Sequence, residues 1–229
     1  MHQPTAISRT RAESHARRDE SVTLAGTLPQ AQTRSTAEIR SMLNKLRLMA
    51  EALSPYPDLQ VKASHGGGWS CALGRDAEKH AERYVRGEID SLEELPPALF
   101  RPTHINADLD DIAAWPEQRI IGVQAHEIGH AKHTDYKLFL KGQREALSQG
   151  GLPSSWALVC NALEDPWVNN REMEASDPRR DALQELYGFW IEKHQSGVEK
   201  ASLLTQVALN AIHYWATGKG LPSLTDERV

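Results

Sequence analysis

The chain has 229 residues, of which 40% are hydrophobic and 25% charged, and its formal net charge is −5. A chain of this length can bury one sizeable hydrophobic core, its acidic balance argues against general nucleic-acid binding, and it has no run of the roughly 18 to 20 apolar residues that a membrane span needs. The N-terminus lacks the apolar core of a signal peptide, and Cys71 and Cys160 do not make a disulfide framework. We therefore expect a soluble, cytoplasmic protein without membrane association.

Residues 1–33 differ in composition from the rest of the chain. They are rich in Arg, Ser, Thr and Gln and show no apolar periodicity, which is typical of a disordered or loosely docked tail. Its arginines can offer a contact to a partner protein, although a solvated tail is the simpler interpretation. Ser35 and Glu38 then form a capping box ahead of apolar residues at helical spacing. We expect residues 34–229 to form a single domain.

Two short segments with alternating apolar residues follow this first helix. Residues 59–63 and 69–73 flank His65-Gly66-Gly67-Gly68, a pattern that predicts a β-hairpin. A His-Gly-Gly-Gly string is also typical of the oxyanion loop of esterases, but the chain has no Gly-x-Ser-x-Gly nucleophile motif, so a flexible turn is favoured. Residues 76–86 then predict a short polar helix, and residues 104–109 predict another half-buried strand.

Residues 126–130 read His-Glu-Ile-Gly-His, the most informative motif in the chain. A helix is predicted here because Pro116 suits a first helical turn and an apolar stripe follows it. The imidazoles of His126 and His130 would then lie one turn apart and can occupy two corners of a zinc tetrahedron, with Glu127 beside them. An ordinary amphipathic helix with two surface histidines is the alternative. Small residues would let a neighbouring helix approach closely, namely Gly122, Ala125 and Gly129.

A catalytic zinc site needs a third protein ligand, and a second predicted helix, from about Ser154 to Glu174, offers two acidic candidates. We expect Glu164 to be the ligand and Asp165 to accept the outer N–H of a ligating imidazole, but the two roles can be exchanged. Pro166 directly follows them, which predicts either a kink or the start of a new helix with Asp165 as its cap.

Further helices are expected after the motif. His133 shares a helical face with both motif histidines, but three ligands on one straight helix would lie too far apart for one tetrahedral ion, so we expect it to line the pocket or end the helix. Asp177-Pro178 begins another predicted helix, and a last apolar stripe ends at Gly218 and Gly220. These helices would cover the motif helix and the helix that bears Glu164.

The two motif segments together resemble a known family. His-Glu-Ile-Gly-His-Ala-Lys-His-Thr-Asp at 126–135, paired with Asn-Ala-Leu-Glu-Asp at 161–165, resembles gluzincin-type metallopeptidases, and most closely the metallopeptidase-like domains linked to von Willebrand type A domains, including CobT-type cobaltochelatase subunits. The resemblance implies zinc held by His126, His130 and Glu164, with Glu127 as general base. It also implies a zincin-like fold around residues 100–175. Metzincins fit less well, because their third histidine and its preceding glycine are missing.

The resemblance also suggests how a substrate would bind. Residues 104–109 take the place of the edge strand that pairs with an extended peptide in zincins, whereas an ordinary sheet strand is the alternative. Four side chains are candidates for an additional oxyanion donor, although packed or surface roles are the simpler interpretation for each: Tyr136, Tyr187, His194 and His213.

We therefore predict an α+β, helix-rich zincin-like domain with a small sheet next to the HExxH helix. It would act as a Zn²⁺-dependent metallopeptidase on peptide or protein substrates. One alternative is a zinc-binding scaffold or assembly component without turnover. Another is a narrowly specific regulatory protease of the ImmA/IrrE kind, which cuts a single partner protein. An intact Glu127 favours an enzyme, because a purely structural zinc site needs no base.

Overall fold

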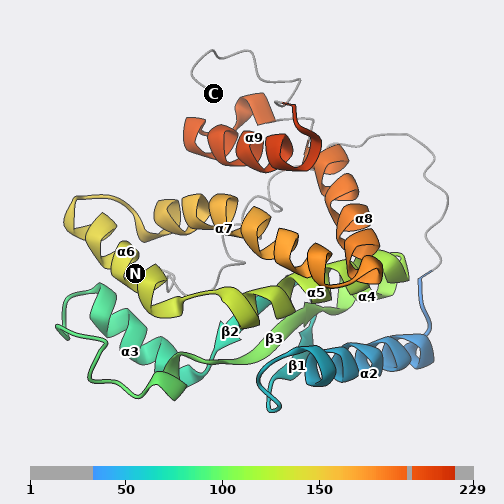
Figure 1. Ribbon diagram of the computed structural model, residues 1–229, viewed down its shortest axis with the longest axis horizontal. Coiled ribbons are helices and arrows are strands. Elements are labelled where there is room, and N and C mark those ends of the chain that lie inside the picture. The colour runs from blue at the N-terminus through green and yellow to red at the C-terminus, as the bar shows by residue number, and fades with distance from the viewer. Residues whose placement is uncertain (1–32, 195–197, 220–229) are drawn as a thin grey trace.

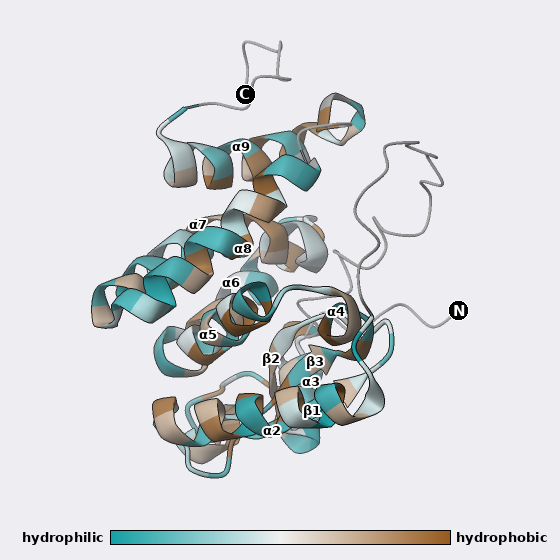
Figure 2. Cartoon of the chain, turned by 90° about the vertical axis from the view of Figure 1, so that its right-hand side faces the viewer, coloured by the Kyte–Doolittle hydropathy of each residue, from teal (hydrophilic) through white to brown (hydrophobic). Residues whose placement is uncertain are grey.

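The computed structural model describes residues 33–194 and 198–219, and these form a helix-rich α+β structure with one small sheet. Two helices, α2 (Thr36–Leu53) and α5 (Glu117–His133), lie beside each other next to the strands (Figures 1 and 2). Beyond α5 come α7 (Pro153–Ala175), α8 (Asp177–His194) and α9 (Leu203–Thr217). The helix that carries the motif therefore lies between the sheet and a second layer of helices.

The sheet contains β1 (Gln60–Ser64), β2 (Ser70–Leu73) and β3 (Pro102–Asp108) in the order β1-β3-β2. β3 is parallel to β1 and antiparallel to β2. The predicted hairpin is therefore wrong, because β3 lies between the two strands that were expected to pair. Alternating apolar residues determine which face a side chain takes but not which strand is its neighbour. Strands lie about 4.8 Å apart, so a short connection can step over one strand.

β3 is the central strand, and this corrects its expected role. Both of its edges are hydrogen-bonded to neighbouring strands, so an extended peptide cannot pair with it. Ile105 and Ala107 are fully buried, while His104 and Asn106 on the opposite face are only partly covered. β3 is thus an ordinary sheet strand whose apolar face packs on helices.

Acidic residues at the end of β3 and just after it hold the glycine-rich turn. The helix α4 (Leu109–Ala114) begins beside this turn, and Asp110 accepts hydrogen bonds from His65 Nδ1 (2.7 Å) and the Gly66 amide (3.1 Å). The hydrogen bond from His65 lowers the pKa of the Asp110 carboxyl below its ordinary value. Asp108 accepts from the Gly68 amide at 2.9 Å. The amides of Gly66 and Gly68 thus donate to carboxylates, as expected for a structural connection rather than an oxyanion loop.

The main core lies between the sheet, α2 and α5. Ile120, Val123 and Ile128 of α5 pack in it with apolar residues of α2 and β3. Gln124 of α5 also donates to the Leu46 carbonyl of α2 at 3.2 Å. A second cluster joins α3 (Arg75–Val85) to Phe100 of the short helix η1 (Pro97–Phe100) and to α6 (Tyr136–Ser148). Because α5 is covered on several sides, polar side chains on it are withdrawn from water.

Most predicted helices are confirmed. The capping box of Ser35 and Glu38 is present at the start of α2, and α3 matches the expected polar helix. α7 continues through Pro166, so no new helix begins there. Gly218 ends α9 with φ of 71°, whereas Gly220 and residues 1–32 lie outside the described residues. No helix was expected from the sequence at α4 or α6.

None of the helices in the described part of the chain is long and apolar enough to cross a membrane.

Two glycines of α5 allow the second layer of helices to come close. A Cβ atom on Gly122 would lie 2.2 Å from the Ala182 carbonyl oxygen of α8, and one on Gly129 would lie 2.5 Å from Val168 Cγ1 of α7. The prediction that small residues permit close helix packing is confirmed at both positions.

The substitution Gly122→Ala should destabilise the protein by about 1–3 kcal/mol, because the new methyl group meets backbone that cannot move aside. Gly188→Ala in α8 is the matched control, since a Cβ there meets nothing within 4 Å. The free energy of unfolding of the control should rise by up to about 1 kcal/mol, because alanine has a higher helix propensity than glycine. Urea unfolding of both variants measures the difference, and equal stabilisation by the two substitutions would contradict this packing.

Candidate metal centre

The two motif histidines lie one turn apart on α5, with their rings in a T-shaped, edge-to-face arrangement. Their Nε2 atoms are 3.2 Å apart, and their ring centroids are 4.5 Å apart. His130 is only 3% exposed, whereas His126 is partly buried. The interpretation as two solvated surface histidines therefore does not apply to His130.

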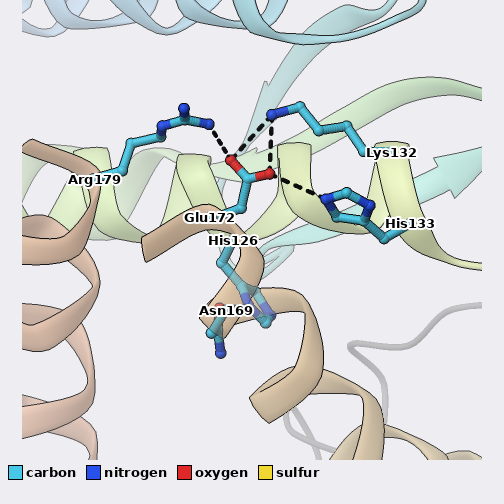
Figure 3. Close-up of polar contacts among 6 residues, drawn as sticks. All are labelled: His126, Lys132, His133, Asn169, Glu172 and Arg179. Carbon is cyan, nitrogen blue, oxygen red and sulfur yellow. Dashed lines mark hydrogen bonds and ion pairs between the residues drawn. The ribbon is translucent and has the colours of Figure 1, made fainter. Parts of the chain in front are cut away.

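The other ring nitrogen of each histidine faces a polar side chain. His126 Nδ1 lies 2.9 Å from Asn169 Oδ1 on α7 (Figure 3), and Asn169 Nδ2 donates to the Tyr187 hydroxyl of α8 at 2.6 Å. His130 Nδ1 lies 3.0 Å from Thr134 Oγ1. With both Nδ1 atoms donating to these oxygens, each neutral imidazole keeps its lone pair on Nε2. The two lone pairs then converge on one point.

Asp165 of α7 adds an oxygen to this pair of nitrogens. Its Oδ1 lies 3.2 Å from His130 Nε2, and the donor atoms of His126, His130 and Asp165 all lie within 4.8 Å of one another. Zinc bonds of about 2.0–2.1 Å at tetrahedral angles place neighbouring ligand atoms about 3.3 Å apart. Two of the three separations thus match two edges of such a tetrahedron.

The chemistry of the three donor atoms also fits a divalent cation. Two imidazole lone pairs and a carboxylate oxygen are all acceptors, and acceptors at this distance repel one another unless a cation or a proton lies between them. Two nitrogens and one oxygen are the donor set of many catalytic zinc sites, while cobalt and manganese accept similar ligands. His126, His130 and Asp165 are therefore the residues suited to hold a metal ion.

Glu164 takes a different position from the one expected. Its Oε2 lies 3.8 Å from His130 Nδ1, on the side of the ring that faces away from the converging nitrogens. Successive residues of a helix point about 100° apart, and here Asp165 faces the Nε2 side of the His130 ring while Glu164 lies near its Nδ1 side. The structure places Asp165 with the histidines, which is the exchange of roles that the sequence left open.

Gly129 allows α7 to reach the histidines. A Cβ atom here would also lie 3.0 Å from Glu172 Cγ, so α7 crosses α5 where side-chain bulk is absent. This crossing lies between His126 and His130 in the sequence. The close approach lets Asp165 and Asn169, one turn apart on α7, face the imidazoles from the same side.

The remaining predicted site residues lie around this group. Glu127 is 5% exposed, in the middle of α5. His133 is the last residue of α5, and its Nε2 lies 3.3 Å from Glu172 Oε1, with the Trp167 ring 5.6 Å away. His133 is therefore not one of the three donors, as its spacing along the helix predicts.

Of the four candidate oxyanion donors, only Tyr187 is placed beside the histidines among the described side chains, with its ring centroid 6.4 Å from that of His126. Tyr136 packs in the second core cluster, and His213 Nδ1 lies 2.7 Å from the Lys219 carbonyl oxygen. The side chain of His194 lies outside the described residues. Sequence reasoning missed Asn169 and Thr134, although each lies four residues after a site residue, a spacing that marks a shared helical face.

The substitution Asn169→Ala should weaken zinc binding by about 10–100-fold, because it removes the acceptor that orients His126 and fixes its tautomer. Asn170→Ala is the matched control, since Asn170 instead accepts a hydrogen bond from Trp215 Nε1 at 3.2 Å. Titration of metal-free protein in competition with a chromophoric chelator measures both affinities. Equal affinities of the two variants would argue against this role for Asn169.

Comparison with known proteins does not assign a family to this geometry: no family model, no curated protein and no solved structure matches the chain. The metal centre is therefore inferred from the residues themselves. Two imidazole nitrogens and one carboxylate oxygen converge there, with His130 Nε2 3.2 Å from each of the other two atoms.

Proposed function

We propose that the chain is a zinc-dependent hydrolase that cleaves peptide bonds, with zinc held by His126, His130 and Asp165. The observation that carries this proposal is the spacing of the donor atoms, which is 3.2 Å from His130 Nε2 to both His126 Nε2 and Asp165 Oδ1. Three protein ligands leave the fourth position of a tetrahedral ion open, as catalysis requires. A helix-rich α+β fold with a small sheet beside the motif helix also fits the zincin-like architecture.

Residues around the three proposed ligands help to hold the metal by orienting the ligand side chains. Asn169 and Thr134 orient the two imidazoles, and Tyr187 in turn fixes the amide of Asn169. Tyr187 also packs edge-on against Trp215 of α9, with ring centroids 5.1 Å apart. The second layer of helices thus supports the metal ligands from outside. When bound, zinc supplies a coordinated water of pKa about 7 and polarises the substrate carbonyl.

Glu127 is the general base of the proposed reaction. It directly follows the ligand His126, so its side chain projects beside the metal position, about 100° further around α5. There it accepts the proton of the attacking water and later donates it to the leaving amine. A carboxylate that is only 5% exposed within α5 is costly to bury. A purely structural zinc site needs no base beside the metal, so an acidic residue at this position supports a catalytic role.

One observation favours a second candidate, a zinc-binding scaffold without turnover. Glu127 and His130 are only 5% and 3% exposed, so a substrate has limited access to them. A scaffold needs the metal but not the base. The substitution Glu127→Gln separates the two functions, because it keeps the shape of the side chain and removes its ability to accept a proton.

Glu127→Gln should leave zinc content unchanged and lower peptide hydrolysis by about 10²–10⁴-fold. Mass spectrometry of new N-termini in a mixture of unfolded proteins detects cleavage of any peptide bond, whichever sequence the enzyme prefers. Glu117→Gln in the exposed first turn of α5 is the matched control and should retain full activity. Undiminished hydrolysis by Glu127→Gln would contradict the mechanism, and zinc binding without any cleavage by the wild type would favour the scaffold.

A further inference from the structure

Glu172 is a buried carboxylate to which the proposed reaction assigns no part. It is 1% exposed, and both of its oxygens contact positively charged or titratable groups (Figure 3). Lys132 Nζ lies 2.9 Å from Oε1 and 3.0 Å from Oε2. Arg179 donates to Oε2, and His133 Nε2 lies 3.3 Å from Oε1. Glu172 is therefore the centre of a charged cluster that is largely withdrawn from water.

The cluster connects the three helices that form the metal centre. Lys132 and His133 belong to α5, Glu172 to α7, and Arg179 to the first turns of α8. At the metal centre, α5 supplies the two histidines, α7 supplies Asp165 and Asn169, and α8 supplies Tyr187. Lys132 follows the proposed ligand His130 by two residues, so the cluster and the metal centre share one stretch of α5.

Glu172 also shares a face of α7 with Asp165. The two lie seven residues apart, which is two helical turns. Between them, α7 touches α5 at Gly129, where an added Cβ would lie 2.5 Å from Val168 and 3.0 Å from Glu172. Contact at Gly129 permits the helices to come close but does not fix the rotation of α7. A charged anchor on the same face as Asp165 supplies that constraint.

The energetics of buried charge explain why this anchor would be strong. Lys132 and Arg179 have side chains that are 20% and 15% exposed, and both face the single carboxylate of Glu172. Removing one member of such a cluster leaves the others buried and uncompensated, which is strongly destabilising locally. Loss of the Glu172 charge would therefore push Lys132 and Arg179 toward water and shift α7 relative to α5.

We infer that Glu172 is a positioning residue of the metal centre, which fixes α7 on α5 so that Asp165 Oδ1 completes the donor set. This inference rests on the metal site of the proposed function but not on turnover. Glu172 acts through Asp165 and touches neither substrate nor metal. Its effect is therefore measurable as zinc affinity, whether or not the protein cleaves peptides.

Zinc affinity of Glu172→Gln, measured by chelator competition on the full chain, should fall by about 10–100-fold, as for other groups that orient metal ligands. Glu185→Gln is the matched control, because Glu185 also joins α8 to α5 through Arg119 at 2.9 Å but at the other end of α5. The control should keep the wild-type affinity. In an Asp165→Ala background, Glu172→Gln should cause no further loss, because its route to the metal is already removed.

A merely structural role predicts a different result. Glu172→Gln would then lower the unfolding midpoint while leaving the zinc dissociation constant of the folded protein unchanged, and this would overturn the inference. The inference would also be overturned if the losses of zinc affinity caused by Glu172→Gln and by Asp165→Ala simply added in the double variant. If Glu172→Gln does not fold, Arg179→Gln is the second variant, because it leaves Lys132 in contact with the Glu172 carboxylate. It should still weaken zinc binding, and an unchanged zinc affinity would again contradict the inference. Zinc binding that depends on Glu172, without any peptide cleavage, would refute only the proposed activity.

Discussion

The contact of α7 with α5 at Gly129 is the constraint on which the rest of the site depends. Any side chain at this position would collide with Val168 and Glu172. Because glycine has no Cβ, the two helices approach closely enough for Asp165 and Asn169 to reach His126 and His130. The histidines alone supply two donor nitrogens, and α7 adds the third donor atom from Asp165. The glycine within the motif is thus as necessary to the geometry as the residues that flank it.

The polar groups of the site are buried, so they need partners within the protein. His130 and Glu127 lie in a helix that is covered by the sheet on one side and by α7 and α8 on others. Polar groups in such a position must be satisfied, and here the outer nitrogens are satisfied by Asn169 and Thr134. The Nε2 atoms of both histidines and Asp165 Oδ1 converge on the other side of the rings, and a cation suits such a set of donor atoms.

The sequence predicted those features that depend on local periodicity. The motif helix, α7, α8 and the capping box of Ser35 follow from spacing and end signals along one segment. It did not predict that β3 separates β1 from β2, because strand partners are chosen by tertiary packing. The choice between Glu164 and Asp165 likewise depends on the rotation of α7 about its axis. We infer that this rotation is set by the distant contacts of Glu172 with Lys132 and Arg179, which no pattern within residues 161–165 contains.

Elemental analysis of the purified protein is the first measurement to make, because it shows whether His126, His130 and Asp165 bind one metal ion. We expect about one zinc per chain in the wild type after loosely bound ions are removed, with zinc content strongly reduced in Asp165→Ala, which keeps only the weaker two-histidine site, and retained in Glu164→Ala. Loss of zinc in Glu164→Ala alone would make Glu164 the third ligand and contradict the geometry described above. A wild-type protein that holds no zinc even after reconstitution would refute the metal centre altogether.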